Sequence, residues 1–184
     1  MIVRMHQKLL KRVEEPHHAR FLTFSCRHRL PLFNQDWTKD VFIEQLRLAR
    51  ERMGFHLVAF VVMPEHIHLI LWPNLPDFPA ATVLYRLKRN VAKEIVGRWR
   101  EAGVQSLSKI TDPNGKVRFW QPGGGYDRNI VSDDEMREKI EYIHANPVRR
   151  GLVKSPTGYR WSSAKWYAGD RDGSLSIDPA TRPI

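Results

Sequence analysis

The sequence predicts an α+β protein with a ferredoxin-like (RRM-like) fold, an antiparallel sheet with helices packed on one face. Strand patterns and helix patterns alternate along the chain, two strand patterns are separated only by a short turn, and 184 residues suffice for one sizeable core. We therefore expect a single domain over residues 18–168, a basic N-terminal arm at 1–17 and a polar, disordered C-terminal tail at 169–184.

The first strand and the first helix are expected near the start of this domain. Residues 19–26, ARFLTFSC, are rich in aromatic and β-branched side chains that alternate with their neighbours, as in a strand. The following segment, 36–53, places apolar side chains at helical spacing. Asp36 is the expected N-cap of this amphipathic helix, and Gly54 is the expected stop.

A hairpin and a second helix come next. The apolar runs 55–63 and 66–72 are joined only by a Pro64–Glu65 turn, so they should pair as antiparallel strands. A helix over about 80–101, closed by Gly103, has one apolar stripe and one face with many cations and few acids. Such a face is usually only solvated, but on a basic chain it favours contact with phosphates.

The last elements are a short strand and a well-marked helix. Residues 117–120, VRFW, form the expected strand after a turn. Ser132 and Glu135 have the spacing of a capping box, which predicts a helix over 133–145. This helix should end before Pro147, because proline disfavours the helical conformation of the residue that precedes it.

Composition limits the possible partners and compartments. The 30 Lys and Arg residues exceed the 20 Asp and Glu residues, giving a net charge of +10, which favours nucleic acid first and an anionic membrane surface second. No apolar run approaches the roughly 20 residues of a membrane helix, and no secretory signal is apparent, so we expect a cytoplasmic protein. The single cysteine, Cys26, excludes an internal disulfide and is expected to be a small buried side chain.

Two histidines in the second hairpin strand are candidate metal ligands. Alternation places His66 and His68 on one face of the strand, opposite the uniformly apolar Ile67, Leu69 and Leu71. Both imidazoles can therefore reach one ion. Each histidine can equally be a half-buried side chain satisfied by one hydrogen bond, and the spacing alone leaves both interpretations open.

The helix over 133–145 carries two further candidates. Tyr142 and Asn146 lie one turn apart, on a face about 100° away from the apolar stripe of the helix. Taken singly, the tyrosine can be the edge of a core and the asparagine an ordinary residue of a helix end.

Three segments together resemble a known family. VVMPEHIHLILWP, EYIHANPVRRGLV and YRWSSAKWY occur in the order and with the spacing typical of the single-tyrosine transposases of the IS200/IS605 group, and more closely of REP-associated tyrosine transposases, a branch of the HUH nucleases. The resemblance covers about residues 19–168. It implies a ferredoxin-like sheet whose strand carries the histidines and whose C-terminal helix carries the tyrosine.

The resemblance also implies an activity and a site. Tyr142 matches the catalytic nucleophile, and His66, His68 and, less specifically, Asn146 match ligands of a divalent metal, Mg²⁺ or Mn²⁺. The implied reaction is nicking and strand transfer of single-stranded DNA near hairpins through a 5′-phosphotyrosine. A non-catalytic RRM-like nucleic-acid-binding module and a metal-dependent phosphodiesterase without a covalent step are the alternatives.

Nucleic-acid contacts are expected from basic and aromatic side chains. Trp120, Tyr126, Trp161 and Trp166 are candidates for stacking on unpaired bases, and the Gly123–Gly125 loop departs from the usual pattern of the family. The oligomeric state implied by the resemblance is a monomer or a homodimer. The cations expected to bind DNA are Arg4, Lys8, Lys11, Arg12, Arg86, Lys88, Arg89, Lys93, Arg128, Arg149 and Arg150.

Overall fold

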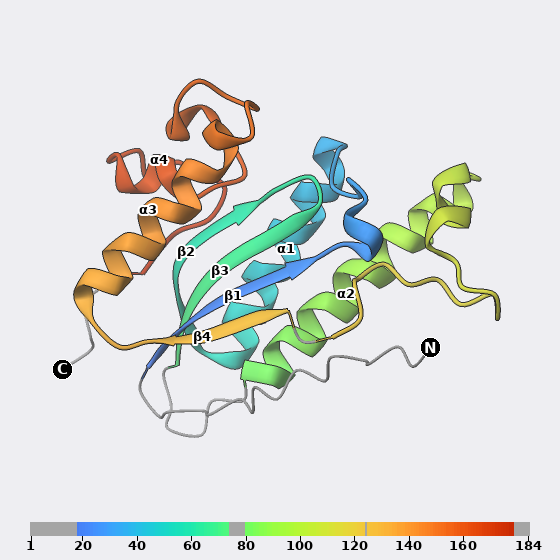
Figure 1. The fold of residues 1–184 in the computed structure, drawn as a ribbon, viewed down its shortest axis with the longest axis horizontal. Helices are drawn as coiled ribbons and strands as arrows, with labels where there is room; N and C mark the ends of the chain where they lie inside the picture. Colours follow the sequence, from blue (N-terminus) through green and yellow to red (C-terminus); the bar gives the residue numbers. More distant parts are fainter. Residues whose placement is uncertain (1–17, 74–79, 124, 179–184) are drawn as a thin grey trace, which may run out of the picture.

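A computed structural model describes residues 18–73, 80–123 and 125–178 of the chain. Four strands form one antiparallel sheet in the order β2-β3-β1-β4 (Figure 1). The strands are β1 (Ala19–Ser25), β2 (Phe55–Val62), β3 (His66–Pro73) and β4 (Tyr126–Ile130). The longer helices are α1 (Asp36–Met53), α2 (Ala80–Glu101) and α3 (Asp133–Arg149), followed by a short α4 (Ala164–Tyr167).

The predicted ferredoxin-like order of strands and helices is confirmed for the described residues. β1, α1, β2, β3, α2 and β4 follow one another along the chain, with β1 and β3 central in the sheet. The hairpin of β2 and β3 turns at Pro64–Glu65 as expected, and Gly54 ends α1 in the left-handed conformation with φ of 61°. Among the described helices, none is long and apolar enough to cross a membrane.

The two faces of the sheet are covered by different helices. Ile67, Leu69 and Leu71 pack with α1 and α2 in the larger core, as their alternation predicts, and we call this side the α1–α2 face. His66 and His68 lie on the opposite side, which we call the histidine face. This face is partly covered by α3 (Figure 1).

The expectation that all helices pack on one face is therefore wrong for α3. Its apolar stripe of Met136, Ile140 and Ile143 needs a buried surface, and the histidine face supplies one through Phe21 and Ile70. The α+β class holds, because the other two long helices lie together behind the sheet.

Two helix ends differ from the predicted ones. Gln35, not Asp36, is the N-cap of α1, while the Asp36 carboxylate pairs with Lys39 Nζ at 3.0 Å. At the other end of the chain, α3 continues through Pro147 to Arg149. Proline removes one backbone donor, but Arg150 N still bonds to Asn146 O at 3.0 Å, so the last turn is retained.

The fourth strand lies at β4 and not at the predicted residues 117–120. Residues 119–121 make only brief contacts with the end of β1, through Arg27 N to Phe119 O at 2.8 Å and Gln121 N to Ser25 O at 2.9 Å. The chain then turns at Gly125, with φ of 70°, before β4 begins. Glycine breaks the ladder here, so that regular pairing starts only after it.

The C-terminal segment is packed as far as residue 178, in contrast to the expected disordered tail. Leu175 and Ile177 are buried in the larger core. The Asp178 carboxylate accepts hydrogen bonds from Leu57 N at 2.8 Å and from Arg50 at 2.6 Å, which ties the segment to β2 and α1. Cys26 is buried as expected, and this burial raises the pKa of its thiol to about 12.

Candidate active site

The two histidines of β3 meet at their ring nitrogens. His66 Nε2 and His68 Nε2 lie 3.0 Å apart, and the residues are only 6% and 4% exposed. Their positions follow from the strand, because alternate side chains share a face and β1 pairs with β3 directly beneath them. The sequence pattern thus corresponds to one compact, nearly buried pair of imidazoles.

Two oxygens lie at the outer nitrogens of this pair. Thr23 Oγ1, on the paired strand β1, lies 2.7 Å from His68 Nδ1. Glu65 Oε1 lies 3.3 Å from His66 Nδ1. In the tautomer with the proton on Nδ1, each ring faces an oxygen on its outer side and both Nε2 lone pairs point inward.

Burial keeps both imidazoles uncharged at neutral pH. It lowers the pKa of His66, and it lowers the pKa of His68 to about 3, with the neighbouring His66 adding to the effect. Two inward lone pairs only 3.0 Å apart repel each other unless a proton or a cation lies between them. Two nitrogens bound at about 2.1 Å to one ion, about 90° apart, are separated by about 3.0 Å. The pair therefore fits adjacent positions on a divalent metal ion.

Tyr142 of α3 lies beside the histidine pair and is partly open to solvent. Its ring centroid is 5.3 Å from that of His68 and 6.1 Å from that of Phe21, and the residue is 37% exposed. Phe21 also stacks on His68 at 5.6 Å, so one aromatic side chain supports both. The guanidinium of Arg149 lies 5.5 Å from the Tyr142 ring centroid. A phenolic hydroxyl, two imidazoles and a guanidinium thus lie close together in one chain.

Asn146 is held one turn after Tyr142. It is 8% exposed, and its Nδ2 donates a hydrogen bond to the Tyr142 carbonyl at 2.8 Å, which leaves Oδ1 as the oxygen of the amide that can bind a cation. Within the described ranges, no group of three His, Cys, Asp or Glu side chains could hold a metal. Asn146 Oδ1 is the predicted third ligand, and phosphate oxygens or water would complete the shell of such an ion. The role of Asn146 stays a prediction.

The comparisons of sequence and of structure with known proteins find similar proteins of the same name. No family model matches the chain. The REP-associated tyrosine transposase of Escherichia coli strain K12 is 30% identical over 118 residues, which cover 64% of this chain and 59% of that protein. A putative REP-associated tyrosine transposase of Haemophilus influenzae is 24% identical over 145 residues, covering 78% of this chain and 77% of that one.

A solved structure agrees with these relatives in fold. The structure of a REP-associated tyrosine transposase bound to a REP hairpin superposes with a TM-score of 0.68 at 20% identity, covering 95% of this chain and 92% of that one. The chain is similar to REP-associated tyrosine transposases in sequence, and one of them shares its fold. The matched part spans 59% of the length of the Escherichia coli relative.

The cations predicted to bind DNA are dispersed over the described residues. Arg149 lies at Tyr142, but Arg150 pairs with buried Glu65 at 3.0 Å and Arg128 pairs with Glu135 at 2.9 Å. The four cations of α2 that were predicted to bind DNA lie on a helix of the α1–α2 face, away from the histidines. The predicted contacts of the N-terminal arm, Arg4, Lys8, Lys11 and Arg12, lie outside the described residues.

The predicted stacking aromatics also differ in their surroundings. Tyr126 is 47% exposed and meets the edge of Phe21 at 5.9 Å, close to the histidine face. Trp161 donates to Asp40 at 2.8 Å and lies under Lys39 Nζ at 3.9 Å, which indicates a structural role. Trp166 is partly buried beneath the Arg171 guanidinium at 3.7 Å.

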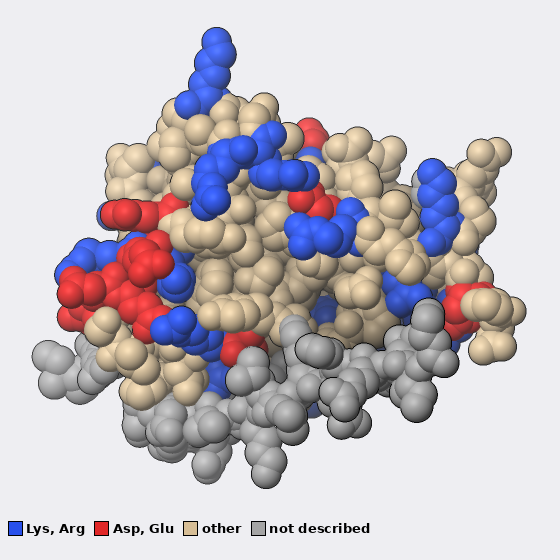
Figure 2. Space-filling model, in the orientation of Figure 1, with Lys and Arg blue, Asp and Glu red and all other residues tan. Residues whose placement is uncertain are grey.

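Charge is unevenly distributed over the histidine face. Figure 2 shows an uncharged central area with Lys and Arg above it and to its right, and with Asp and Glu gathered at the left, where α3 begins. The acids of that first turn are Asp133, Asp134 and Glu135. They stabilise the N-terminus of α3, and their negative charge repels a polyanion from that end of the face.

Three supporting residues were missed by reasoning from sequence. Glu65 could have been found, because it directly precedes His66 in the MPEHIH segment. Thr23 and Phe21 could not, because their roles depend on the register of β1 against β3, where Thr23 is opposite His68.

Proposed function

We propose that this chain is a metal-dependent nickase and strand transferase of single-stranded DNA that acts near DNA hairpins through a 5′-phosphotyrosine intermediate. The observation that carries the proposal is the partly exposed Tyr142, 5.3 Å in ring centroids from one of two buried imidazoles whose Nε2 atoms are 3.0 Å apart. The comparisons support it. Two relatives are named as tyrosine transposases, one of them putative, and a similar solved structure is that of a REP-associated tyrosine transposase bound to a REP hairpin.

The chemistry follows from the position of Tyr142. The phenolic oxygen attacks the scissile phosphorus, forming a Tyr–O–P bond as the P–O3′ bond breaks. The leaving 3′ oxygen takes up a proton and becomes a 3′-OH, while the phenol loses its proton. Because the phosphodiester bond is replaced by a phosphotyrosine ester, a 3′-OH can reverse the step on another strand, and transfer needs no ATP.

The metal ligands proposed here are His66, His68 and the side-chain oxygen of Asn146. A bound Mg²⁺ or Mn²⁺ would act as a Lewis acid on the scissile phosphate, and phosphate oxygens suit these hard ions as further ligands. The protein's own part is to hold the imidazoles uncharged by burial and to direct them inward through Thr23 and Glu65.

Phosphate binding completes the proposed site. Arg149, 5.5 Å from the Tyr142 ring, is placed to hold a phosphate of the strand at the nucleophile. The partly exposed Tyr126, near Phe21, offers a ring to an unpaired base at the β4 edge. Both contacts lie on the histidine face.

A denaturing gel tests the proposal. Labelled single-stranded DNA that carries a hairpin and unpaired flanks is incubated with the protein and Mn²⁺, beside a Tyr142→Phe variant and a chelator control. A denaturant-resistant protein–DNA adduct is expected with wild type only. Cleavage that persists in Tyr142→Phe identifies a phosphodiesterase without a covalent step, and binding without any cleavage identifies a non-catalytic module; either result overturns the proposal.

A further inference from the structure

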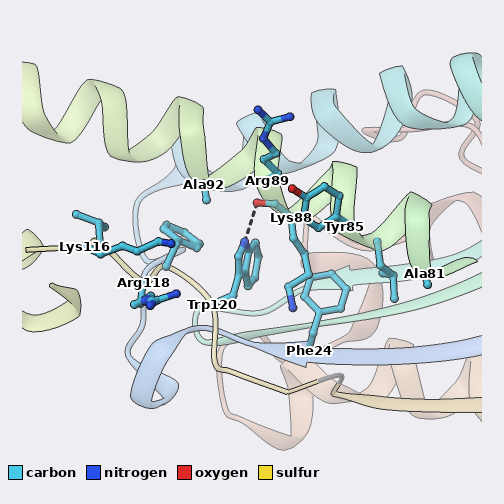
Figure 3. A pocket seen from close by; sticks show the side chains of 12 residues that line it. Phe24, Ala81, Tyr85, Lys88, Arg89, Ala92, Lys116, Arg118 and Trp120 are labelled. Carbon is cyan, nitrogen blue, oxygen red and sulfur yellow. Dashed lines mark hydrogen bonds between the residues drawn. The ribbon is translucent and has the colours of Figure 1, made fainter. Parts of the chain in front are cut away.

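A second candidate site lies on the α1–α2 face, away from the histidines. A cavity of about 500 Å³ opens between α2 and residues 116–120 (Figure 3). This volume is within the range of ordinary ligand pockets, roughly 300–1,000 Å³. Nothing in the proposed chemistry at Tyr142 uses this cavity.

The walls of the cavity are aromatic. Trp120 donates its Nε1 hydrogen to the Lys88 carbonyl at 2.8 Å, and its ring meets Phe24 at 5.1 Å between centroids (Figure 3). Tyr85, on the first turns of α2, is 65% exposed. A fixed indole beside an exposed phenol ring offers flat apolar surfaces to a planar ligand.

The cavity is also strongly basic. Lys88, Arg89, Lys116 and Arg118 line it, and among the described lining residues there is no Asp or Glu. Lys88 Nζ lies 5.4 Å from the Phe24 ring centroid and 5.7 Å from that of Trp120, so charge and aromatic rings occupy the same space. Aromatic rings interleaved with cations fit a ligand that combines a flat base with a phosphate.

The edge of the sheet connects this cavity with the histidine face. Residues 119–121 contact the end of β1, and β4 pairs with its beginning, so one stretch of chain carries Trp120 on one face and Tyr126 near the other. Gly125 joins them so closely that a Cβ there would lie 2.1 Å from Thr23 O.

We propose that this pocket binds one unpaired nucleotide of the DNA strand whose scissile phosphate lies at Tyr142. The inference rests on the proposed function, because it assigns the pocket to the same substrate. The base stacks on Tyr85 and Trp120, and its phosphate pairs with Arg89, because Arg118 already pairs with Asp112 at 3.0 Å. The hairpin duplex cannot enter such a pocket, so the site reads only the single-stranded flank.

Photocross-linking locates the nucleotide directly. Tyr142→Phe protein, which binds without forming an adduct, is irradiated with hairpin DNA that carries 5-iododeoxyuridine at one unpaired position at a time. We expect one flank position to cross-link to a peptide that contains Tyr85 or Trp120, and an excess of unlabelled flank DNA to suppress it. Cross-links confined to the peptides that contain Tyr126 or position 142 would overturn the inference.

Binding measurements provide the matched test. Tyr85→Ala and Arg89→Gln should each weaken binding of flanked hairpins at least fivefold and leave binding of blunt hairpins unchanged. Arg52→Gln, an exposed change of the same charge on α1, is the control. Thermal unfolding verifies that each variant is folded.

The outcomes separate this inference from the proposed function. If wild type forms the adduct while both variants bind flanked DNA normally, the pocket proposal is wrong and the nicking proposal stands. If the pocket peptides cross-link but wild type forms no adduct, the pocket proposal holds and the nicking proposal is wrong.

Discussion

The two faces of the sheet belong to the same strands, but they differ in where their polar side chains lie. The histidine face buries His66 and His68 uncharged, with Thr23 and Glu65 at their outer nitrogens, and leaves Tyr142 partly open. The α1–α2 face buries almost only apolar side chains and carries its cations outside, on α2. One face thus carries the proposed active site, and the other carries the larger apolar core and the proposed nucleotide pocket.

This difference shows where the fold tolerates buried polar groups. A buried polar atom is costly unless it is hydrogen-bonded, and the cross-strand hydroxyl of Thr23 meets this need for His68, while the Glu65 carboxylate lies 3.3 Å from His66 Nδ1. On the opposite side of the same strand, Ile67 and Leu69 meet the helices with no polar group at all. Pairs of variants, with one substitution on each face, test this difference most directly.

The largest expected effect is on catalysis. His68→Ala should lower the rate of adduct formation at least 100-fold, because it removes one of the two inward nitrogens, while DNA binding changes less than threefold. Rates come from single-turnover gels and affinities from fluorescence anisotropy. Val91→Ala, at a buried position of α2, is the control on the other face. Equal losses of the rate of adduct formation in His68→Ala and Val91→Ala would contradict this difference between the two faces.

The second prediction compares two buried isoleucines. Ile143→Ala and Ile95→Ala each remove a fully buried side chain, one from α3 and one from α2, and each should cost about 3 kcal/mol of unfolding free energy. At temperatures where both variants stay folded, only Ile143→Ala should also slow adduct formation, because it loosens the helix that carries Tyr142. Urea unfolding and single-turnover rates measure the two effects. Similar rates for both would show that α3 packing does not position the nucleophile.

Much of the difference between the two faces of the sheet could be predicted from the sequence. Period-two alternation placed His66 and His68 opposite Ile67 and Leu69, and the apolar stripe of Met136 and Ile140 predicted a packed helix. Which face that helix covers could not be predicted, because an apolar stripe indicates that a helix is buried but not against what.

The remaining errors have similar physical causes. Residues 117–120 have strand-like composition, but strand formation depends on a partner, and β1 is paired by β4 only up to Thr23. Pro147 indicated a helix end, yet the helix continued, because a proline removes only one donor and the flanking bonds remain. The role of Arg150 at a phosphate stays a prediction, and its pairing with Glu65 could not be predicted because it depends on the position of α3 beside the hairpin turn.

The third prediction concerns acid. Burial lowers the pKa of His144 to about 4, and its Nε2 lies 2.8 Å from Ser163 Oγ, which links α3 to the C-terminal segment. A histidine with a folded pKa below its unfolded value, about 6.5, stabilises the fold above pH 6.5, and this stability is lost as the pH falls toward 4. At pH 5 the loss for this group is about 2 kcal/mol.

Urea unfolding at pH 7.5 and pH 5.0, with a chelator present, measures this loss. His144→Gln should reduce the difference in unfolding free energy between the two pH values, because it removes a group that takes up a proton only on unfolding. The matched control is His56→Gln, at a half-exposed histidine beside Asp178. An unchanged pH dependence in His144→Gln would exclude its burial as a source of the acid sensitivity.

The smallest expected effect separates two adjacent arginines. Arg149 lies over the Tyr142 ring, whereas Arg150 is 3.0 Å from the carboxylate of Glu65, just before His66. Arg149→Gln should weaken DNA binding less than tenfold and reduce the slope of log affinity against log salt by about 0.7 to 0.9, as expected for one lost phosphate contact. Arg150→Gln should leave that slope unchanged and cost about 1 kcal/mol of unfolding free energy or less, because its side chain is mostly exposed. Equal salt slopes for the two variants would place both arginines on the DNA and return Arg150 to its predicted role.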